Sequence, residues 1–328
     1  MKTESAILIL VCTLLLSACG ELPRENTECF ELSEYGEAFA SDNAVFCVGK
    51  DEISAYGLDG EKLSSLEKSS AEMQYSTAGS YAIISDENGI YISDGENTRH
   101  NCEKNKIMST AINKNGYAVV CTEEAGYKGS ITVFDENFVP LYKWYSASGF
   151  IIKAALSENN ILAVLTANEE GSRVHIFELD SENEKYTVSI PDELAIDFAW
   201  LADKLCVISE KAAYFAEKDV IKKSVDFDGN LGEYAFGDER LFIELLRGDG
   251  MSEIFSYDEN GREKGNVQCE FLRGITADSI GAAVISGNDA VLYDENLKEL
   301  SRSDARGARN VMIIGGELYL LRDKTVFK

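Results

Sequence analysis

Residues 151–190, IIKAALSENNILAVLTANEEGSRVHIFELDSENEKYTVSI, contain four short stretches rich in apolar residues, separated by polar segments. The stretches cover residues 151–156, 161–165, 174–177 and 185–190, and residues rich in Ser, Glu, Asp and Asn fill 157–160 and 180–183. Asp and Asn favour tight turns because they tolerate left-handed backbone and bond to their own main chain. Strands of this length at hairpin spacing predict one four-stranded antiparallel sheet.

The second of these stretches recurs along the chain at steps of 36 to 44 residues. A period near forty carried by strands is typical of a β-propeller, in which four-stranded blades such as WD40-like repeats surround an axis. The runs predict eight blades, and seven stays open because the first and last units are the weakest. The seven other runs are at 44–48, 81–84, 117–121, 205–208, 241–243, 282–285 and 318–321.

The two ends of the repeat complement each other. The sequence stops at Lys328, just after the eighth run, so the last unit lacks its outer strand, whereas residues 29–32 precede the first unit as a spare strand. Pairing this segment with the last blade would close the ring and cover an exposed edge. We therefore expect a single all-β propeller domain over residues 28–328, closed by an N-terminal strand.

The first residues are predicted to form a targeting signal. Residues 6–16 are apolar but too short to span a bilayer, and they fit the core of a secretory signal. Residues 16–20, LSACG, resemble the lipobox of bacterial lipoproteins. The resemblance implies a signal peptide at 1–18, lipidation of Cys19 and a tether at 19–27, which together predict lipid anchoring on the extracytoplasmic face of the cell membrane. An ordinary secretory signal, cut elsewhere, is the alternative.

Composition excludes some partners and cofactors. Lys and Arg number 31 against 57 Asp and Glu, a net charge of −26, so nucleic acid would be repelled and is not an expected partner. A divalent cation is compatible with this charge, but nothing in the sequence supports a site for one. The charge also fits the plainer role of keeping the protein soluble. The cysteines beyond the signal, at 29, 47, 102, 121, 206 and 269, show no metal-ligand spacing, and we expect free structural thiols and no metal site.

Four aromatic residues mark a possible interaction surface. In a blade, the loops after the second and fourth strands share one face of the disc, so Tyr127 should meet Trp144, Tyr145 and Phe150 beside the third and fourth blades. Clustered exposed aromatic residues are enriched in protein-binding surfaces. The alternative is that Trp144 and Phe150 pack between neighbouring blades, where they would serve stability alone.

The same region carries a family resemblance. Residues 126–129 (GYKG), 133–134 (VF), 143–146 (KWYS) and 154–157 (AALS) are similar to a family of uncharacterised envelope propellers of Gram-positive bacteria, domain of unknown function 5711. The resemblance runs from about Cys29 to the C-terminus. It implies a β-propeller held at the membrane, and it implies no activity.

Catalytic motifs are missing from the sequence. His100 and His175 are the two histidines, and no G-x-S-x-G, H-E-x-x-H or phosphate-binding loop occurs, so we assign no catalytic residue and no cofactor. The sequence therefore favours a lipid-anchored extracytoplasmic β-propeller that acts as a non-catalytic protein-binding or scaffold module for another envelope protein. A glycan-active hydrolase or lyase using carboxylates of the central channel is the alternative, which two acids facing each other there would support.

Overall fold

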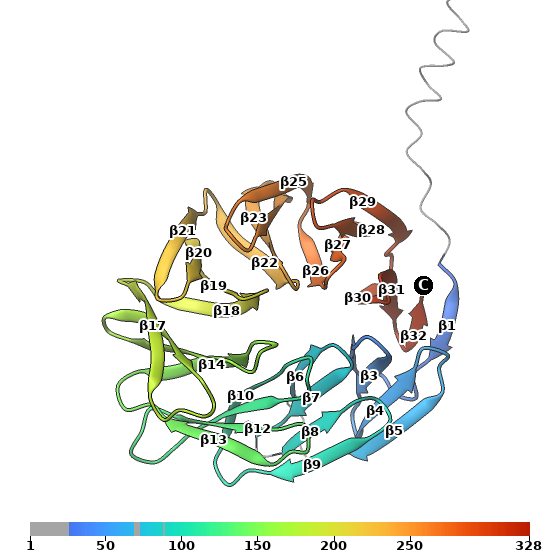
Figure 1. The fold of residues 1–328 in the computed structure, drawn as a ribbon. Helices are drawn as coiled ribbons and strands as arrows, with labels where there is room; N and C mark the ends of the chain where they lie inside the picture. Colours follow the sequence, from blue (N-terminus) through green and yellow to red (C-terminus); the bar gives the residue numbers. More distant parts are fainter. Residues whose placement is uncertain (1–25, 69–72, 88) are drawn as a thin grey trace, which may run out of the picture.

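The computed structural model describes residues 26–68, 73–87 and 89–328. Eight antiparallel sheets of four strands each stand as blades around a central axis, and the described residues contain no helix (Figure 1). The fold is a β-propeller, and the prediction of eight blades is confirmed.

The first strand of each blade lies nearest the axis and the fourth lies at the rim (Figure 1). The strands of the first four blades are β2 (Glu37–Ala40), β3 (Ala44–Val48), β4 (Glu52–Gly57) and β5 (Lys62–Glu67); β6 (Gln74–Ala78), β7 (Tyr81–Ser85), β8 (Gly89–Ser93) and β9 (Thr98–Cys102); β10 (Ile107–Ile112), β11 (Ala118–Thr122), β12 (Ser130–Phe134) and β13 (Pro140–Tyr145); and β14 (Phe150–Leu156), β15 (Leu162–Asn168), β16 (Gly171–Phe177) and β17 (Glu184–Pro191).

Blades 5 to 8 follow the same order, except that the last takes its fourth strand from the start of the chain. Their strands are β18 (Ala195–Leu201), β19 (Lys204–Ser209), β20 (Ala212–Glu217) and β21 (Val220–Asp226); β22 (Asn230–Phe236), β23 (Arg240–Gly248), β24 (Met251–Asp258) and β25 (Glu263–Glu270); β26 (Leu272–Ala277), β27 (Gly281–Ser286), β28 (Asp289–Asp294) and β29 (Glu299–Asp304); and β30 (Ala308–Ile314), β31 (Glu317–Arg322), β32 (Thr325–Phe327) and β1 (Glu28–Glu31).

Blade 8 closes the ring, as the sequence predicted. Strand β1 pairs antiparallel with β32, and the backbones of Thr27 and Lys328 exchange two hydrogen bonds of 2.9 Å. Lys324 adds an ion pair to Glu31 at 3.1 Å. The edge of β32 is therefore covered by the other end of the same chain.

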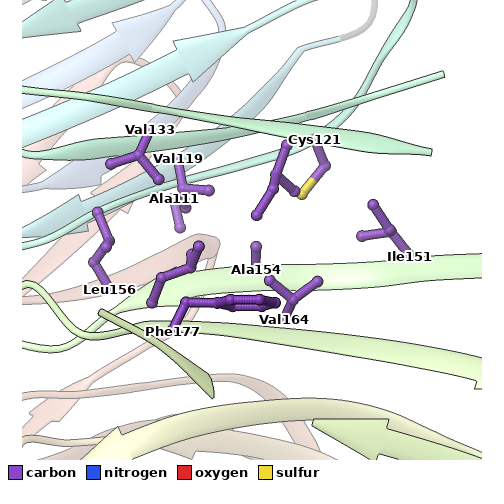
Figure 2. Packing of buried hydrophobic residues seen from close by; sticks show 11 residues of the cluster. Ala111, Val119, Cys121, Val133, Ile151, Ala154, Leu156, Val164 and Phe177 are labelled. Carbon is purple, nitrogen blue, oxygen red and sulfur yellow. The ribbon is translucent and has the colours of Figure 1, made fainter. Parts of the chain in front are cut away.

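The core lies between the blades. Every residue of β3 and β11 is buried, whereas the rim strand β13 is half exposed. Between blades 3 and 4, side chains from both sheets interdigitate around Phe177, which is fully buried (Figure 2). Removing these apolar faces from water is the main force that stacks one blade on the next.

The turns between third and fourth strands share one chemistry, which the sequence also predicted. The Oδ1 atom of Asp135 accepts backbone N–H groups from Asn137 at 2.9 Å and Val139 at 2.7 Å. Asp258 and Asp294 accept the N–H groups two and four residues ahead of them in the same way. The carboxylates thus cap the turns by accepting main-chain N–H groups.

The two sides of the ring carry different connections. We call the side with the second-to-third and blade-to-blade connections the loop face, and the opposite side the turn face. On the loop face the two kinds of connection are joined by backbone bonds, such as Lys128 N–H to Ser146 C=O at 2.7 Å and Ala305 N–H to Asn288 C=O at 2.7 Å. Because β1 is a fourth strand, it starts on the turn face and ends on the loop face.

The six cysteines within the described residues are free. Cys47, Cys121 and Cys206 are buried in second strands, where a thiol acts as a small apolar side chain. Burial raises the pKa of the Cys121 thiol to about 11. Cys12 and Cys19, with the predicted signal peptide and most of the tether, lie outside the described residues.

Candidate interaction surface

Tyr127 and Tyr145 meet on the loop face of blade 3. Tyr127 lies in the connection from β11 to β12, and Tyr145 ends the neighbouring strand β13. Two backbone bonds hold the segments together, from Lys128 N–H to Ser146 C=O and from Ser146 N–H to Gly129 C=O. The ring centroids are 4.8 Å apart, and the residues are 49% and 40% exposed. Two aromatic rings are thus presented to solvent on a braced loop.

Phe150 extends this surface toward the axis. It begins β14 and is 59% exposed, so it does not pack between blades. The Nζ of Lys128 lies 4.5 Å from the centre of its ring, and the Nζ of Lys143 lies 5.0 Å from that of Tyr145. Such cation–π contacts orient the lysines across the rings. We call Tyr127, Tyr145 and Phe150 the aromatic surface.

Trp144 belongs to a different environment. Because successive side chains of a strand alternate, Trp144 points away from its neighbour Tyr145 and toward blade 4. Its ring lies 5.3 Å from that of Phe177 and is partly buried against the blade 3–blade 4 cluster. Trp144 therefore packs against the neighbouring blade, and the structure separates it from the other three aromatic residues.

His175 is fully engaged. Its Nδ1 lies 3.0 Å from Oε1 of Glu184 and its Nε2 lies 3.0 Å from the hydroxyl of Thr166. This hydroxyl–imidazole–carboxylate order is that of a hydrolytic triad, but Thr166 is only 4% exposed and cannot reach a substrate. His100 stacks on Tyr91 with ring centroids 4.6 Å apart.

A charged cluster joins three first strands. The Nζ of Lys153 on β14 lies 2.6 Å from Oδ1 of Asp197 on β18, and the hydroxyl of Tyr234 on β22 donates to Oδ2 at 3.2 Å. Burial, reinforced by Asp197, raises the pKa of Tyr234. Both oxygens of Asp197 are thus occupied in linking blades, and this cluster is not a pair of facing carboxylates.

The environment of Asp278 favours the protonated form of its carboxyl group. Burial raises its pKa, and the charges of Asp238 and Asp42 add to the shift. Its Oδ1 accepts the backbone N–H groups of Ile280 at 2.7 Å and Gly281 at 3.3 Å, which makes it a turn cap. Asp238 in turn forms an ion pair with Lys114 at 2.5 Å. Asp278 thus serves to cap a turn, and Asp238 serves to hold an ion pair.

Exposed apolar residues concentrate on the loop face. Of the 16 large apolar side chains that are exposed in the described residues, ten lie in loop-face connections or at the strand ends beside them. The sequence reading found three of these and missed the rest. The ten are Tyr35, Tyr75, Tyr127, Tyr145, Phe150, Ile152, Leu194, Ile196, Met251 and Phe271. The ten lie on several blades, and Tyr127 and Tyr145 are in contact with each other, as in the contiguous apolar patches that mark interaction surfaces.

Two hollows open at the rim, each between the outer part of one blade and the third-to-fourth turn of the next. The hollow between blades 3 and 4 has a volume of about 480 Å³, and the one between blades 5 and 6 about 650 Å³. We call them the blade 3–4 hollow and the blade 5–6 hollow. Neither is lined by first-strand residues, so neither belongs to the central channel.

The described residues contain neither a cluster of metal-ligating side chains nor a candidate membrane-spanning helix. No group of three or more His, Cys, Asp or Glu side chains is placed to hold a metal ion there. In the same part of the chain, no helix has the length and apolar character that crossing a membrane requires.

Comparison with known proteins supports the fold. A model of the family of unknown function DUF5711 matches residues 27–324. The crystal structure of Saccharomyces cerevisiae Sqt1 is similar with a TM-score of 0.65 and 9% identity over 93% of this chain and 99% of that one. The C-terminal WD40 domain of Sif2 is similar with a TM-score of 0.65 and 7% identity, over 93% of this chain and 99% of that one.

A chain in the crystal structure of the Mitotic Checkpoint Complex is also similar, with a TM-score of 0.54 and 13% identity over 94% of this chain and 95% of that one. No curated protein matches the sequence. At these identities the structural likeness shows a WD40-like propeller and no more.

Proposed function

Because the chain belongs to the family of unknown function DUF5711, whose description names no activity, we propose a function from its surface: a non-catalytic protein-binding module whose loop face receives the partner. The observation that carries the proposal is the exposed pair of Tyr127 and Tyr145, 4.8 Å apart on a braced loop. Exposed tyrosines offer large contact area with little side-chain entropy to lose. The similar chain in a checkpoint complex is consistent with such a role for a propeller.

The test replaces both tyrosines by alanine. Both side chains are substantially exposed, so the melting temperature should change by less than about 2 °C, whereas partner capture should fall at least about tenfold if they are binding hot spots. Capture is measured by photo-crosslinking in cells from position 128, followed by identification of the crosslinked protein. Leu300→Ala is the matched control, since Leu300 is 51% exposed on the rim strand β29. Unchanged capture in the double variant, or a large loss of stability, would refute the proposal.

The proposed location is the extracytoplasmic face of the cell membrane, through lipid on Cys19. The lipobox-like residues 16–20 support it. Because β1 starts on the turn face, a tether from Cys19 would meet the ring there, leaving the loop face clear of the bilayer. The partner in this setting is another envelope protein.

A further inference from the structure

The blade 3–4 hollow has an apolar wall within a lining that is otherwise polar. Its apolar lining comes from Tyr142 and Trp144 of β13 and from Leu179 in the turn between β16 and β17. Leu141, 48% exposed, lies at its edge. A volume of about 480 Å³ is ample for one or two apolar side chains.

The apolar wall is held rigidly. The ring centroids of Tyr142 and Trp144 lie 5.9 and 5.3 Å from that of Phe177, and Phe177 is fully buried in the cluster between the two blades (Figure 2). A pocket fixed by its own core loses little entropy when it is filled, and this favours binding of a small side chain.

The charge around the hollow is negative. Asp180 and Glu182 line it and form no ion pair with any described residue. Lys143 also lines it, but the ammonium group of Lys143 lies 3.7 Å from Glu124 and 5.0 Å from the Tyr145 ring. The pKa of Tyr142 is raised by burial and further by Glu184 and Glu182. With a net charge of −26 on the whole chain, this site attracts cationic groups.

We propose that the blade 3–4 hollow binds a linear segment of a partner protein that carries an apolar side chain next to an arginine or lysine. The apolar side chain fills the space over Trp144 and Leu179, and the basic side chain pairs with Asp180 and Glu182. Among the described strands, none pairs with the outer edge of β13, so an extended segment can also add to it as a strand. The inference rests on the proposed protein-binding function and names the chemistry of the bound segment.

The blade 5–6 hollow provides an internal comparison. It occupies the equivalent place two blades further on, but its charged lining has four cations, Lys204, Lys222, Lys223 and Arg262, against three carboxylates, Glu217, Glu259 and Glu263. Lys222, Lys223 and Arg262 form no ion pair with a described residue. Cations outnumber carboxylates by one in the blade 5–6 hollow, whereas in the blade 3–4 hollow Asp180 and Glu182 outnumber Lys143, so a basic segment should favour the blade 3–4 hollow.

Trp144 supplies a direct signal for the test. The second tryptophan, Trp200, packs in the cluster between blades 4 and 5, so Trp200→Phe leaves Trp144 as the single tryptophan emitter. The probe is a synthetic nine-residue peptide with one leucine between two arginines, compared with a peptide in which glutamates replace the arginines. We expect a saturable change in Trp144 emission with the basic peptide and none with the acidic one.

Substitution of the two carboxylates tests whether they contact the basic side chains of the peptide. Asp180→Asn with Glu182→Gln should weaken the basic peptide about fivefold at low salt, because two exposed ion pairs are lost. Lys222→Gln in the blade 5–6 hollow is the control and should leave the affinity unchanged. Equal binding of both peptides, an unaltered affinity in the Asp180/Glu182 variant or the absence of a saturable signal would overturn the inference.

The outcome separates this inference from the proposed function. If the Tyr127/Tyr145 variant loses partner capture and the basic peptide does not bind, the proposed function is supported and the inference about the blade 3–4 hollow is wrong. Peptide binding together with unaltered capture in that variant would support the hollow and contradict the loop face as the place where the partner binds. Thermal melts of each variant confirm that the fold is intact.

Discussion

At the residue scale, buried ionisable side chains determine how this fold responds to alkali. Burial raises the pKa of the Cys47 and Cys121 thiols to about 11 and raises that of Cys206, against 9.0 for a free thiol. A thiol with a raised pKa stabilises the folded state fully below pH 9, and the contribution is lost as the pH rises through about 11. We expect the urea midpoint to stay level up to about pH 8.5 and to fall between pH 9 and 11.

The control for the alkaline loss is Cys121→Ala with Cys206→Ala. Both thiols are buried, so the double variant starts from a lower midpoint, but two of the groups that must ionise are gone. Its midpoint should decline less steeply with pH than that of the unaltered protein. Parallel declines would show that other groups, such as Tyr257 with its pKa raised to about 12 by burial, dominate.

Single residues also show where sequence reasoning succeeds and where it stops. The meeting of Tyr127 and Tyr145 could be predicted, because loop order alone brings their segments to one face. The orientation of Trp144 could not be predicted. Side chains alternate along β13, but the sequence does not state which of two adjacent aromatic residues faces inward, and only the burial of the folded strand decides this. The cation–π contacts of Lys128 and Lys143 depend on rotamers and were not predictable.

At the scale of the element, strand β1 carries the closure of the ring. Beyond its pairing with β32, Phe30 stacks on Tyr56 of blade 1 at 6.1 Å, and Leu32 just after the strand is only 1% exposed. The segment thus links the last blade to the first. We expect a variant lacking residues 1–32 to lose about 3 kcal/mol or more of stability from Leu32 alone.

The same deletion exposes β32 as an unpaired edge, which should promote association between molecules. Light scattering on a size-exclusion column would detect dimers or larger species, and urea unfolding would give the stability. A variant lacking only residues 1–25 keeps the described strand and serves as the comparison. A monomer of unaltered stability after removal of residues 1–32 would contradict the role of β1.

Bulges in the first strands explain why part of the loop face escaped sequence analysis. The pairing of β14 with β15 shifts between Ile151 and Lys153, and that of β18 with β19 shifts between Ala195 and Asp197. Each shift leaves one residue, Ile152 or Ile196, outside the ladder and exposed. A single sequence gives the alternation of a regular strand but not the place where it is interrupted.

At the scale of the whole molecule, the period of the sequence predicted the ring, because each blade must cover the apolar faces of its neighbours. The distribution of charge around that ring was not predictable in the same way. The chain has a net charge of −26, yet cations outnumber carboxylates four to three in the lining of the blade 5–6 hollow, whereas two carboxylates and one lysine line the blade 3–4 hollow. Residues far apart in sequence line each hollow, so the local charge of each hollow is known only once the chain is folded.

The direction of β1 also predicts how a lipid-anchored ring would stand on a membrane. A tether of residues 20–26 can extend at most about 25 Å. The described chain begins at the turn face of blade 8, where Thr27 pairs with Lys328. The turn face at blade 8 should therefore lie nearer the bilayer than the loop face at blade 3. A dye on Lys328→Cys should be quenched by a lipid-borne quencher more strongly than a dye on Ser148→Cys, which lies on the loop face, in a protein whose exposed Cys29 and Cys102 are replaced by serine.

Cys19→Ser is the control for this geometry, since it should abolish both labelling by a fatty-acid probe and binding to vesicles. Stronger quenching at Ser148→Cys than at Lys328→Cys would mean that the loop face meets the membrane, and the aromatic surface would then be placed to contact lipid and not a protein. Labelling that persists in Cys19→Ser would place the lipid elsewhere and remove the basis for the tether length. Quenching at the two dye positions and the Cys19→Ser control together test one idea. The idea is that entry of the chain at the turn face leaves the apolar loop face free to bind a partner protein.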